Sequence, residues 1–342
     1  MGDRREASSS SDSSLNTGET RGSSAPSGKE DLRVPPRHLV QKPRDDEADS
    51  SKRQRIEQLE PFSKRLFKIL PRTKILERDD DYSNHYKKTS AWHKGDAYTC
   101  VGDSVSFLVT RVREKTPSIG VIFDKPELEY FRLYRELLIL GRILPPHEHI
   151  VNLRDVLVTK KKVYIISEEC HWTDLEKFFP TATNRSAHLI FKQLCQVVQF
   201  MHRYGVVNNY LLPRSIFFRA DVVLEGVKVF NFARACYSPA LATAVYDNFN
   251  FAEWLEPDEM YYASYMCSPK SDIVMLGRIL MAMFQGGWDL RSPKFRTHKF
   301  DDEAHDLLKL LGPPPLQRLP GVDMTLDDIL RHPWMLMEPR KP

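Results

Sequence analysis

Residues 200–234 read FMHRYGVVNNYLLPRSIFFRADVVLEGVKVFNFAR. The apolar spacing up to Met201 predicts the end of a helix, and Gly205 supplies a turn after it. Two short apolar runs follow, 216–218 and 227–230, and such runs are typical of buried strands. A helix, a turn, a polar loop and two short strands in this order decide the fold of the second half of the chain.

The composition is that of a soluble globular protein with a polar tail, with 41% hydrophobic and 28% charged residues in 342. The formal net charge of +4 is too small to indicate nucleic-acid binding. The five cysteines have no zinc-site or disulfide spacing, which favours a reducing compartment. No apolar run is long enough to cross a bilayer, and the polar N-terminus predicts no secretory signal. We expect a protein of the nucleus, the cytoplasm or both, with no membrane contact and no direct nucleic-acid partner.

The chain divides into four predicted segments. Residues 1–60 are rich in Ser, Gly, Pro and charge, and we expect a disordered tail. Within it, Lys52-Arg53-Gln54-Arg55 is either a nuclear-import signal or a chance cluster. Residues 61–90 read as a basic amphipathic linker that docks a partner or packs on the back of the folded domain. The folded domain is expected at 91–336, followed by a short tail at 337–342.

Within the folded domain, strand patterns come first and helical patterns follow. Apolar strand patterns lie at 106–112 and 119–123, and a hairpin is expected within 151–166. Helical spacing dominates from 187–201 onward, and 271–284 is apolar nearly all round, as in a buried helix. This order predicts an α+β chain with a small β-rich lobe and a larger α-helical lobe.

Short motifs in this order make the chain resemble a protein kinase. Arg135-Glu136-Leu137 is similar to the αC helix, and the stretch from Ser271-Asp272 to Leu276-Gly277 is similar to the S-D-x-x-x-L-G pattern of helix αF. His332-Pro333-Trp334 is similar to the closing motif. The resemblance implies a bilobal protein kinase-like fold. The retained scaffold positions are His202, Gly205, Pro213, Phe232, Pro257, Asp272 and Gly277.

Most of the residues with which a kinase binds nucleotide are missing from this sequence. A kinase needs a glycine-rich loop over the phosphates and a lysine on strand β3. At the loop only Gly102 remains, and the side chains of Ser104 and Ser106 would obstruct the phosphates, so a plain hairpin turn is favoured. The β3 segment 118–124 contains no lysine. Lys125 lies just beyond it and would need a register shift, which turns a side chain to the other face.

Glu136 stands at the αC glutamate position. In a kinase this carboxylate pairs with the β3 lysine. Without that lysine, Glu136 is expected to have no cationic partner, and the alternative is a solvent-exposed helix glutamate.

In the catalytic loop, Asn208, Asn209 and Tyr210 occupy the H-R-D positions implied by the resemblance. Tyr210 replaces the aspartate base, and a phenol with a pKa near 10 is a poor base at neutral pH. Leu212 replaces the lysine that steadies the transferred phosphoryl group. Ser215 replaces the metal-binding asparagine.

The D-F-G positions hold Asn231, Phe232 and Ala233. A neutral amide at Asn231 replaces the anion that chelates magnesium. The replaced residues are those that a kinase uses for catalysis, whereas the residues that support its fold are retained. The resemblance therefore implies a pseudokinase with no cofactor, no metal and no enzyme activity.

Several retained residues are interpreted as structural. His202 could suggest acid–base chemistry, but at its kinase position it is a scaffold residue. Asp272, a charge in an apolar helix, is expected to anchor the backbone of the 208–210 loop. The other predicted structural residues are Pro213, Arg214 and Gly277.

Two stretches resemble the Tribbles family of pseudokinases. One is Leu144-Pro145-Pro146-His147, and the other is 211–218, where Arg214 stands in place of the usual glutamate. This resemblance implies a scaffold that binds MAP-kinase pathway kinases and bZIP transcription factors of the C/EBP type, in stress, immune or developmental signalling. Tribbles proteins generally keep the β3 lysine and the catalytic aspartate, where this chain departs. Their tails also recruit a ubiquitin ligase, and a tail ending at Pro342 is not expected to do so.

The alternative is an atypical active Ser/Thr protein kinase with a rearranged nucleotide site. In that case Lys125, Asp103 or Asp124 would be recruited to the phosphates.

Overall fold

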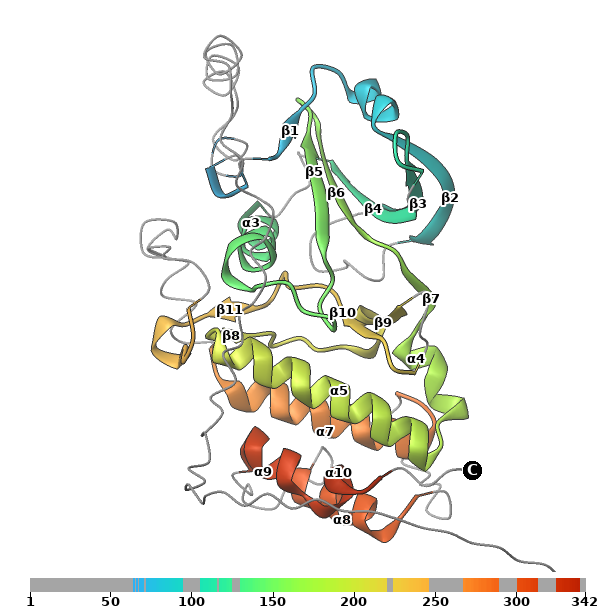
Figure 1. Ribbon diagram of the computed structural model, residues 1–342, viewed down its shortest axis with the longest axis vertical. Helices are drawn as coiled ribbons and strands as arrows, with labels where there is room; N and C mark the ends of the chain where they lie inside the picture. Colours follow the sequence, from blue (N-terminus) through green and yellow to red (C-terminus); the bar gives the residue numbers. More distant parts are fainter. Residues whose placement is uncertain are drawn as a thin grey trace, which may run out of the picture. The chain divides into compact units, whose positions relative to one another are not determined.

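Figure 1 shows the computed structural model of the chain. The described residues are 64–94 (without 65, 67 and 71), 105–115, 117–124, 130–219, 224–245, 267–288, 300–312 and 324–338. The predicted tail 1–60, with its basic cluster at 52–55, lies outside them, as do Gly102, Asp103, Ser104, Lys125 and Pro257.

A six-stranded sheet forms the β-rich half, in the order β1-β5-β6-β4-β3-β2. All neighbours are antiparallel except β1, which runs parallel to β5. The β5–β6 pair is the hairpin predicted within 151–166. The strands are β1 (Lys74–Ile75), β2 (Tyr86–Lys94), β3 (Val105–Arg111), β4 (Pro117–Asp124), β5 (Leu153–Val158) and β6 (Lys162–Glu168), with a 3-10 turn η1 (Asp79–Asn84) before β2.

Helix α3 (Tyr130–Leu138) continues into a π-helical turn η3 (Ile139–Ile143) and lies beside this sheet in Figure 1. The N-terminal segment packs against it, because Leu66 and Ile69 are fully buried in the same core. A Cβ at Gly141 would come within 2.4 Å of the Leu70 side chain, so the close approach of Leu70 depends on this glycine.

The predicted start of the folded domain at residue 91 is therefore wrong, since that residue lies inside β2 and β1 already belongs to the sheet. In the sequence, the many Lys and Arg residues of 61–90 mask the apolar residues that this segment contributes to the folded domain. Lys64, Lys68 and Arg72 are exposed to solvent, whereas Leu66 and Ile69 between them are buried.

The helical half contains α5 (Asn184–Arg203) and α7 (Pro269–Gln285), which lie side by side in Figure 1. Thr183 and Ser186 form a capping box at the start of α5. Thr325 and Asp328 form a second capping box, at the start of α9. The other helices of the described ranges are α4 (Leu175–Phe178), α8 (Asp302–Leu311), α9 (Leu326–Arg331) and α10 (Pro333–Leu336), with 3-10 turns η4 (Phe179–Thr181), η5 (Pro213–Ser215) and η6 (Pro239–Leu241). None of the helices in the described ranges is long and apolar enough to cross a membrane.

Two small sheets lie between the helices and the large sheet. One pairs β10 (Val227–Val229), β9 (Ile216–Arg219) and β7 (Cys170–Asp174), and the other pairs β8 (Val206–Val207) with β11 (Cys236–Tyr237). Backbone hydrogen bonds connect Val229 to His149 and Val151, so β10 is joined directly to the chain that leads into β5. These strands fix both ends of the 208–215 loop.

Candidate functional site

Asp272 anchors the loop at the centre of the candidate site. Its carboxylate is fully buried and accepts hydrogen bonds from the backbone N–H groups of Asn208 (2.9 Å) and Asn209 (2.8 Å). The ring nitrogen Nε2 of His202 lies 3.0 Å from the same carboxylate. This is the backbone anchor predicted from the sequence. A buried carboxylate is tolerated here because three donors replace its hydration.

Two asparagines hold backbone conformations that most residues avoid. Asn209 has φ +60° and Asn231 has φ +61°, both in the left-handed region. Asparagine is, after glycine, among the residues that adopt this region most readily. The loop and the N-F-A segment can therefore turn sharply without glycine.

Ser215 and Asn231, at the positions that the kinase resemblance assigns to magnesium, contact each other. The amide Nδ2 of Asn231 lies 3.5 Å from Oγ of Ser215, and Oδ1 of Asn231 accepts a hydrogen bond from the N–H of Ala233 (3.3 Å). Both side chains are neutral and buried. Magnesium ions prefer carboxylate oxygens, so this donor set does not fit the metal. Within the described ranges, no group of three or more His, Cys, Asp or Glu residues could hold a metal ion.

Tyr210 and Leu212 pack against the main core, where a kinase would carry its catalytic aspartate and lysine. The guanidinium carbon of Arg234 lies 4.4 Å from the centre of the Tyr210 ring, in a cation–π contact. The N–H of Tyr210 donates to Oδ1 of Asn208. The phenol is thus held by packing and by a cation over its face.

Glu136 is buried, with only 2% of its surface exposed, so the alternative of a solvent-exposed helix glutamate is wrong. Its Oε1 accepts a hydrogen bond from the N–H of Phe232 (3.0 Å), whereas Oε2 has no partner among the described residues. Burial raises the pKa of this carboxyl to about 7, and the Phe232 hydrogen bond only partly offsets that rise.

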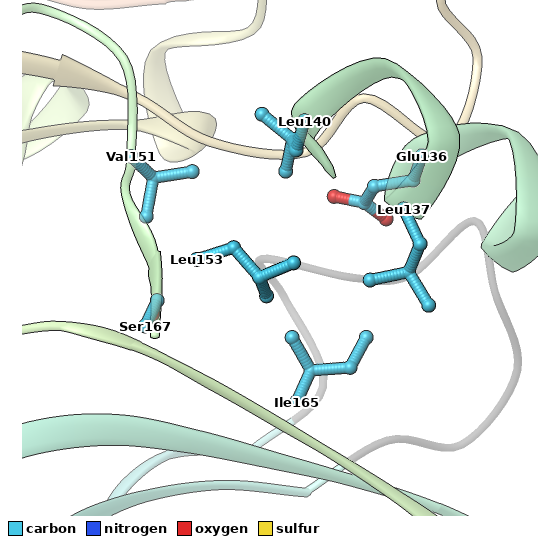
Figure 2. Close-up of a pocket in the computed structure, with 7 residues that line it drawn as sticks. All are labelled: Glu136, Leu137, Leu140, Val151, Leu153, Ile165 and Ser167. Atoms are coloured by element: carbon cyan, nitrogen blue, oxygen red, sulfur yellow. The ribbon is translucent and has the colours of Figure 1, made fainter. Parts of the chain in front are cut away.

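A cavity of about 10 Å³ lies next to Glu136. Figure 2 shows the carboxyl group among the apolar side chains that line this cavity. The volume is near the lower limit for one water molecule. Its lining consists of Glu136, Leu137, Leu140, Val151, Leu153, Ile165 and Ser167.

The face of β4 toward α3 carries apolar residues where a kinase needs its lysine. Ile119 and Val121 join the main core together with Leu137 of α3, whereas Ile122 joins a second cluster on the other face. The strand Pro117–Asp124 contains no lysine. Lys125 and most of the expected phosphate loop lie outside the described residues, and of Ser106 only its place in β3 is described.

The other predicted structural residues lie as follows. Pro213 starts the turn η5 and is buried, and Gly277 is buried in α7. Arg214 is exposed and forms an ion pair with Glu176 of α4, with Nε and Oε2 at 2.5 Å. Arg214 thus ties the 208–215 loop to α4.

Sequence reasoning missed a buried ion pair near the site. The ammonium Nζ of Lys228 lies 2.6 Å from Oε1 of Glu168 and donates to the carbonyl of Ile150 (3.3 Å). Lys228 is only 2% exposed. A lysine inside the apolar run 227–230 was the available signal, because a buried ammonium needs an anionic partner.

Comparison with known proteins agrees with this architecture. The protein kinase domain matches residues 118–335, which is more than half of the chain. The chain therefore belongs to the protein kinase family.

Individual relatives are distant. Serine/threonine-protein kinase PKZ1 of Phytophthora infestans is 26% identical over 242 residues, which cover 60% of each chain. Sperm motility kinase 2B of Mus musculus is 26% identical over 211 residues, which cover 56% of this chain and 41% of the relative. The chain thus aligns with about three fifths of the first relative and two fifths of the second.

Proposed function

We propose that this member of the protein kinase family is catalytically inactive and acts by binding protein partners. The contact of Ser215 with Asn231 carries the proposal, because two neutral side chains satisfy each other where a kinase holds magnesium. Tyr210 in place of the base adds a second loss. With the base and both metal ligands replaced, no route to phosphoryl transfer is available at this site.

The proposed role is that of a scaffold similar to the Tribbles pseudokinases. The supporting sequence features are Leu144-Pro145-Pro146-His147 and Arg214, whose ion pair with Glu176 fixes the loop to α4. The partners proposed on this basis are MAP-kinase pathway kinases and bZIP transcription factors of the C/EBP type, in the nucleus or the cytoplasm. Affinity purification of the full chain followed by mass spectrometry tests this partner class. Recovery of neither class in repeated purifications would contradict the scaffold assignment.

Titration with magnesium and ATP tests the loss of the nucleotide site. A ligand that binds only the native state raises the melting temperature as its concentration rises. We expect no magnesium-dependent rise for this chain, in the same assay in which an active protein kinase shows one. A saturable rise that requires magnesium would contradict the proposal.

Aspartates placed at the positions of the kinase base and the metal-binding residue are expected not to restore phosphate transfer. The double change Tyr210→Asp and Asn231→Asp places a carboxylate at the buried position 231 and removes the ring that packs against the core and Arg234, so the free energy of unfolding should fall by about 2 kcal/mol. Phosphate transfer to a generic protein substrate should stay at background. The matched control is Asn84→Asp, the same chemical change at an exposed residue, which should leave stability nearly unchanged. Gain of transfer by the double variant would mean that the site still holds nucleotide.

The second candidate function is an atypical active Ser/Thr protein kinase. It is favoured by the two distant relatives, which are both named as kinases. It requires Lys125, Asp103 or Asp124 to reach the phosphates. Magnesium-dependent stabilisation by ATP, together with phosphate transfer that Lys125→Ala abolishes, would favour this candidate over the scaffold.

A further inference from the structure

A closed circuit of strands joins the β-rich half of the protein to the helical half. β7 pairs with β9, β9 pairs with β10, and β10 bridges to Ile150 just before β5. β5 pairs with β6, and the single residue Glu169 leads from β6 into β7. A rotation of one half against the other would therefore bend the chain at Glu169 and strain the bridge at Ile150.

Lys228 lies inside this circuit. Its neighbours Val227 and Val229 are fully buried, and its own side chain points to the opposite face of β10. Lysine usually extends its ammonium group to solvent, yet Lys228 is only 2% exposed. The ammonium Nζ lies 2.6 Å from Oε1 of Glu168, at the end of β6, and 3.3 Å from the carbonyl oxygen of Ile150. One side chain of β10 thus reaches both places where the halves are joined.

The partner carboxylate is held in place by the chain that leads into β5. Oε1 of Glu168 also accepts a hydrogen bond from the N–H of Asn152 (2.8 Å), and the N–H of Glu168 donates to the carbonyl of Asn152 (3.0 Å). The adjoining backbone is paired as well. The N–H of Val151 donates to the carbonyl of Val229 (3.1 Å), and the N–H of Val229 donates to the carbonyl of His149 (2.9 Å). Backbone contacts therefore fix both ends of the ion pair.

The ion pair resists separation because its ammonium group is buried. Opposite charges attract strongly in a protein interior, whereas an ammonium that loses its anion keeps the full cost of its burial. A bend at Glu169 that moves Glu168 away from Lys228 would leave only the Ile150 carbonyl to offset this cost. The contact therefore favours a single arrangement of the two halves.

We propose that Lys228 and Glu168 form a buried latch that holds the β-rich half and the helical half of this protein in one fixed orientation. The latch is a conformational device of the connection at Glu169, and it involves neither the 208–215 loop nor the N-F-A segment. It therefore operates whether or not the chain binds nucleotide. For a protein that binds partners, a surface of fixed shape has less conformational freedom to lose on binding.

A double variant separates the latch from general stability. Lys228→Met with Glu168→Gln removes both charges and nearly keeps the length of both side chains. It leaves no unpaired charge in the interior, so the denaturation midpoint should stay close to that of the parent chain. The matched control is Lys87→Met with Glu225→Gln, which makes the same two changes at exposed residues.

Hydrogen–deuterium exchange of the full chain, followed by mass spectrometry, measures local opening at the connection. Relative to the amides in the middle of α5, the amides of Val151 and Asn152 should exchange roughly tenfold faster in the latch variant than in the parent, because the connection opens without global unfolding. The control variant should leave this ratio unchanged. An unchanged ratio in the latch variant would overturn the proposal, because the two charges would then contribute nothing specific to the connection.

Distance measurement between the halves tests the orientation itself. Spin labels are attached to unnatural amino acids that replace the exposed residues Asn84, in η1, and Lys309, in α8, so that the native cysteines are left unlabelled. Double electron–electron resonance should give one narrow distance distribution for the parent chain and one about twice as wide for the latch variant. A distribution of the same mean and width in both proteins would also overturn the latch, because packing alone would then hold the halves in place.

Discussion

Replacing Asp272 by alanine should lower the free energy of unfolding by about 4 kcal/mol, since a buried acceptor for three donors is lost. The N–H groups of Asn208 and Asn209 and the ring of His202 would remain in the interior without their shared partner. Urea denaturation followed by fluorescence measures the loss. The melting temperature should fall by about 10 °C for a domain of this size.

Two further variants sharpen this measurement. Asp272→Asn keeps one acceptor oxygen. Its free energy of unfolding should lie between that of the parent chain and that of Asp272→Ala. Asp302→Ala removes an exposed carboxylate from the first turn of α8 and should change stability by less than about 0.5 kcal/mol. A loss below about 1 kcal/mol for Asp272→Ala would contradict the anchoring role, because other groups would then have replaced the acceptor.

Glu136→Gln should stabilise the protein at alkaline pH. Burial raises the pKa of this carboxyl from 4.5 to about 7. Between these two pH values the native state binds more protons than the unfolded state, so the free energy of unfolding of the parent chain falls as pH rises. Glutamine has nearly the same shape and does not titrate. At pH 8 the variant should be more stable by about 3 kcal/mol, and at pH 4.5 the two proteins should be close.

The control is Glu225→Gln, which changes an exposed glutamate and should give no pH-dependent difference in stability. Unfolding curves of all three proteins at pH 4.5, 6, 7 and 8 make the comparison. A cation such as Lys125 paired with Glu136 would reverse the effect, and the variant would be less stable at pH 8. That reversal would favour the atypical-kinase candidate.

Much of the architecture follows from local patterns. The hairpin 151–166 and the helix around 187–201 are predicted from periodicity alone, and the structure has both. The kinase-like fold followed from the order of short motifs, and the family match confirms it. The predicted start of the domain at residue 91 is wrong, because the charged side chains of 61–90 mask the few apolar residues that are buried there.

For the site, the sequence by itself determined which chemical groups are present: a phenol at residue 210, an amide at residue 231 and no lysine in 118–124. It also indicated the role of Asp272, because a charge in an apolar helix must find donors. Only the tertiary structure decided how those groups pair. Glu136 proved to be buried against Phe232, and Lys228 proved to pair with Glu168 although the two residues are far apart in the chain. Burial and long-range pairing depend on which elements pack together, and no local pattern of residue types carries that information.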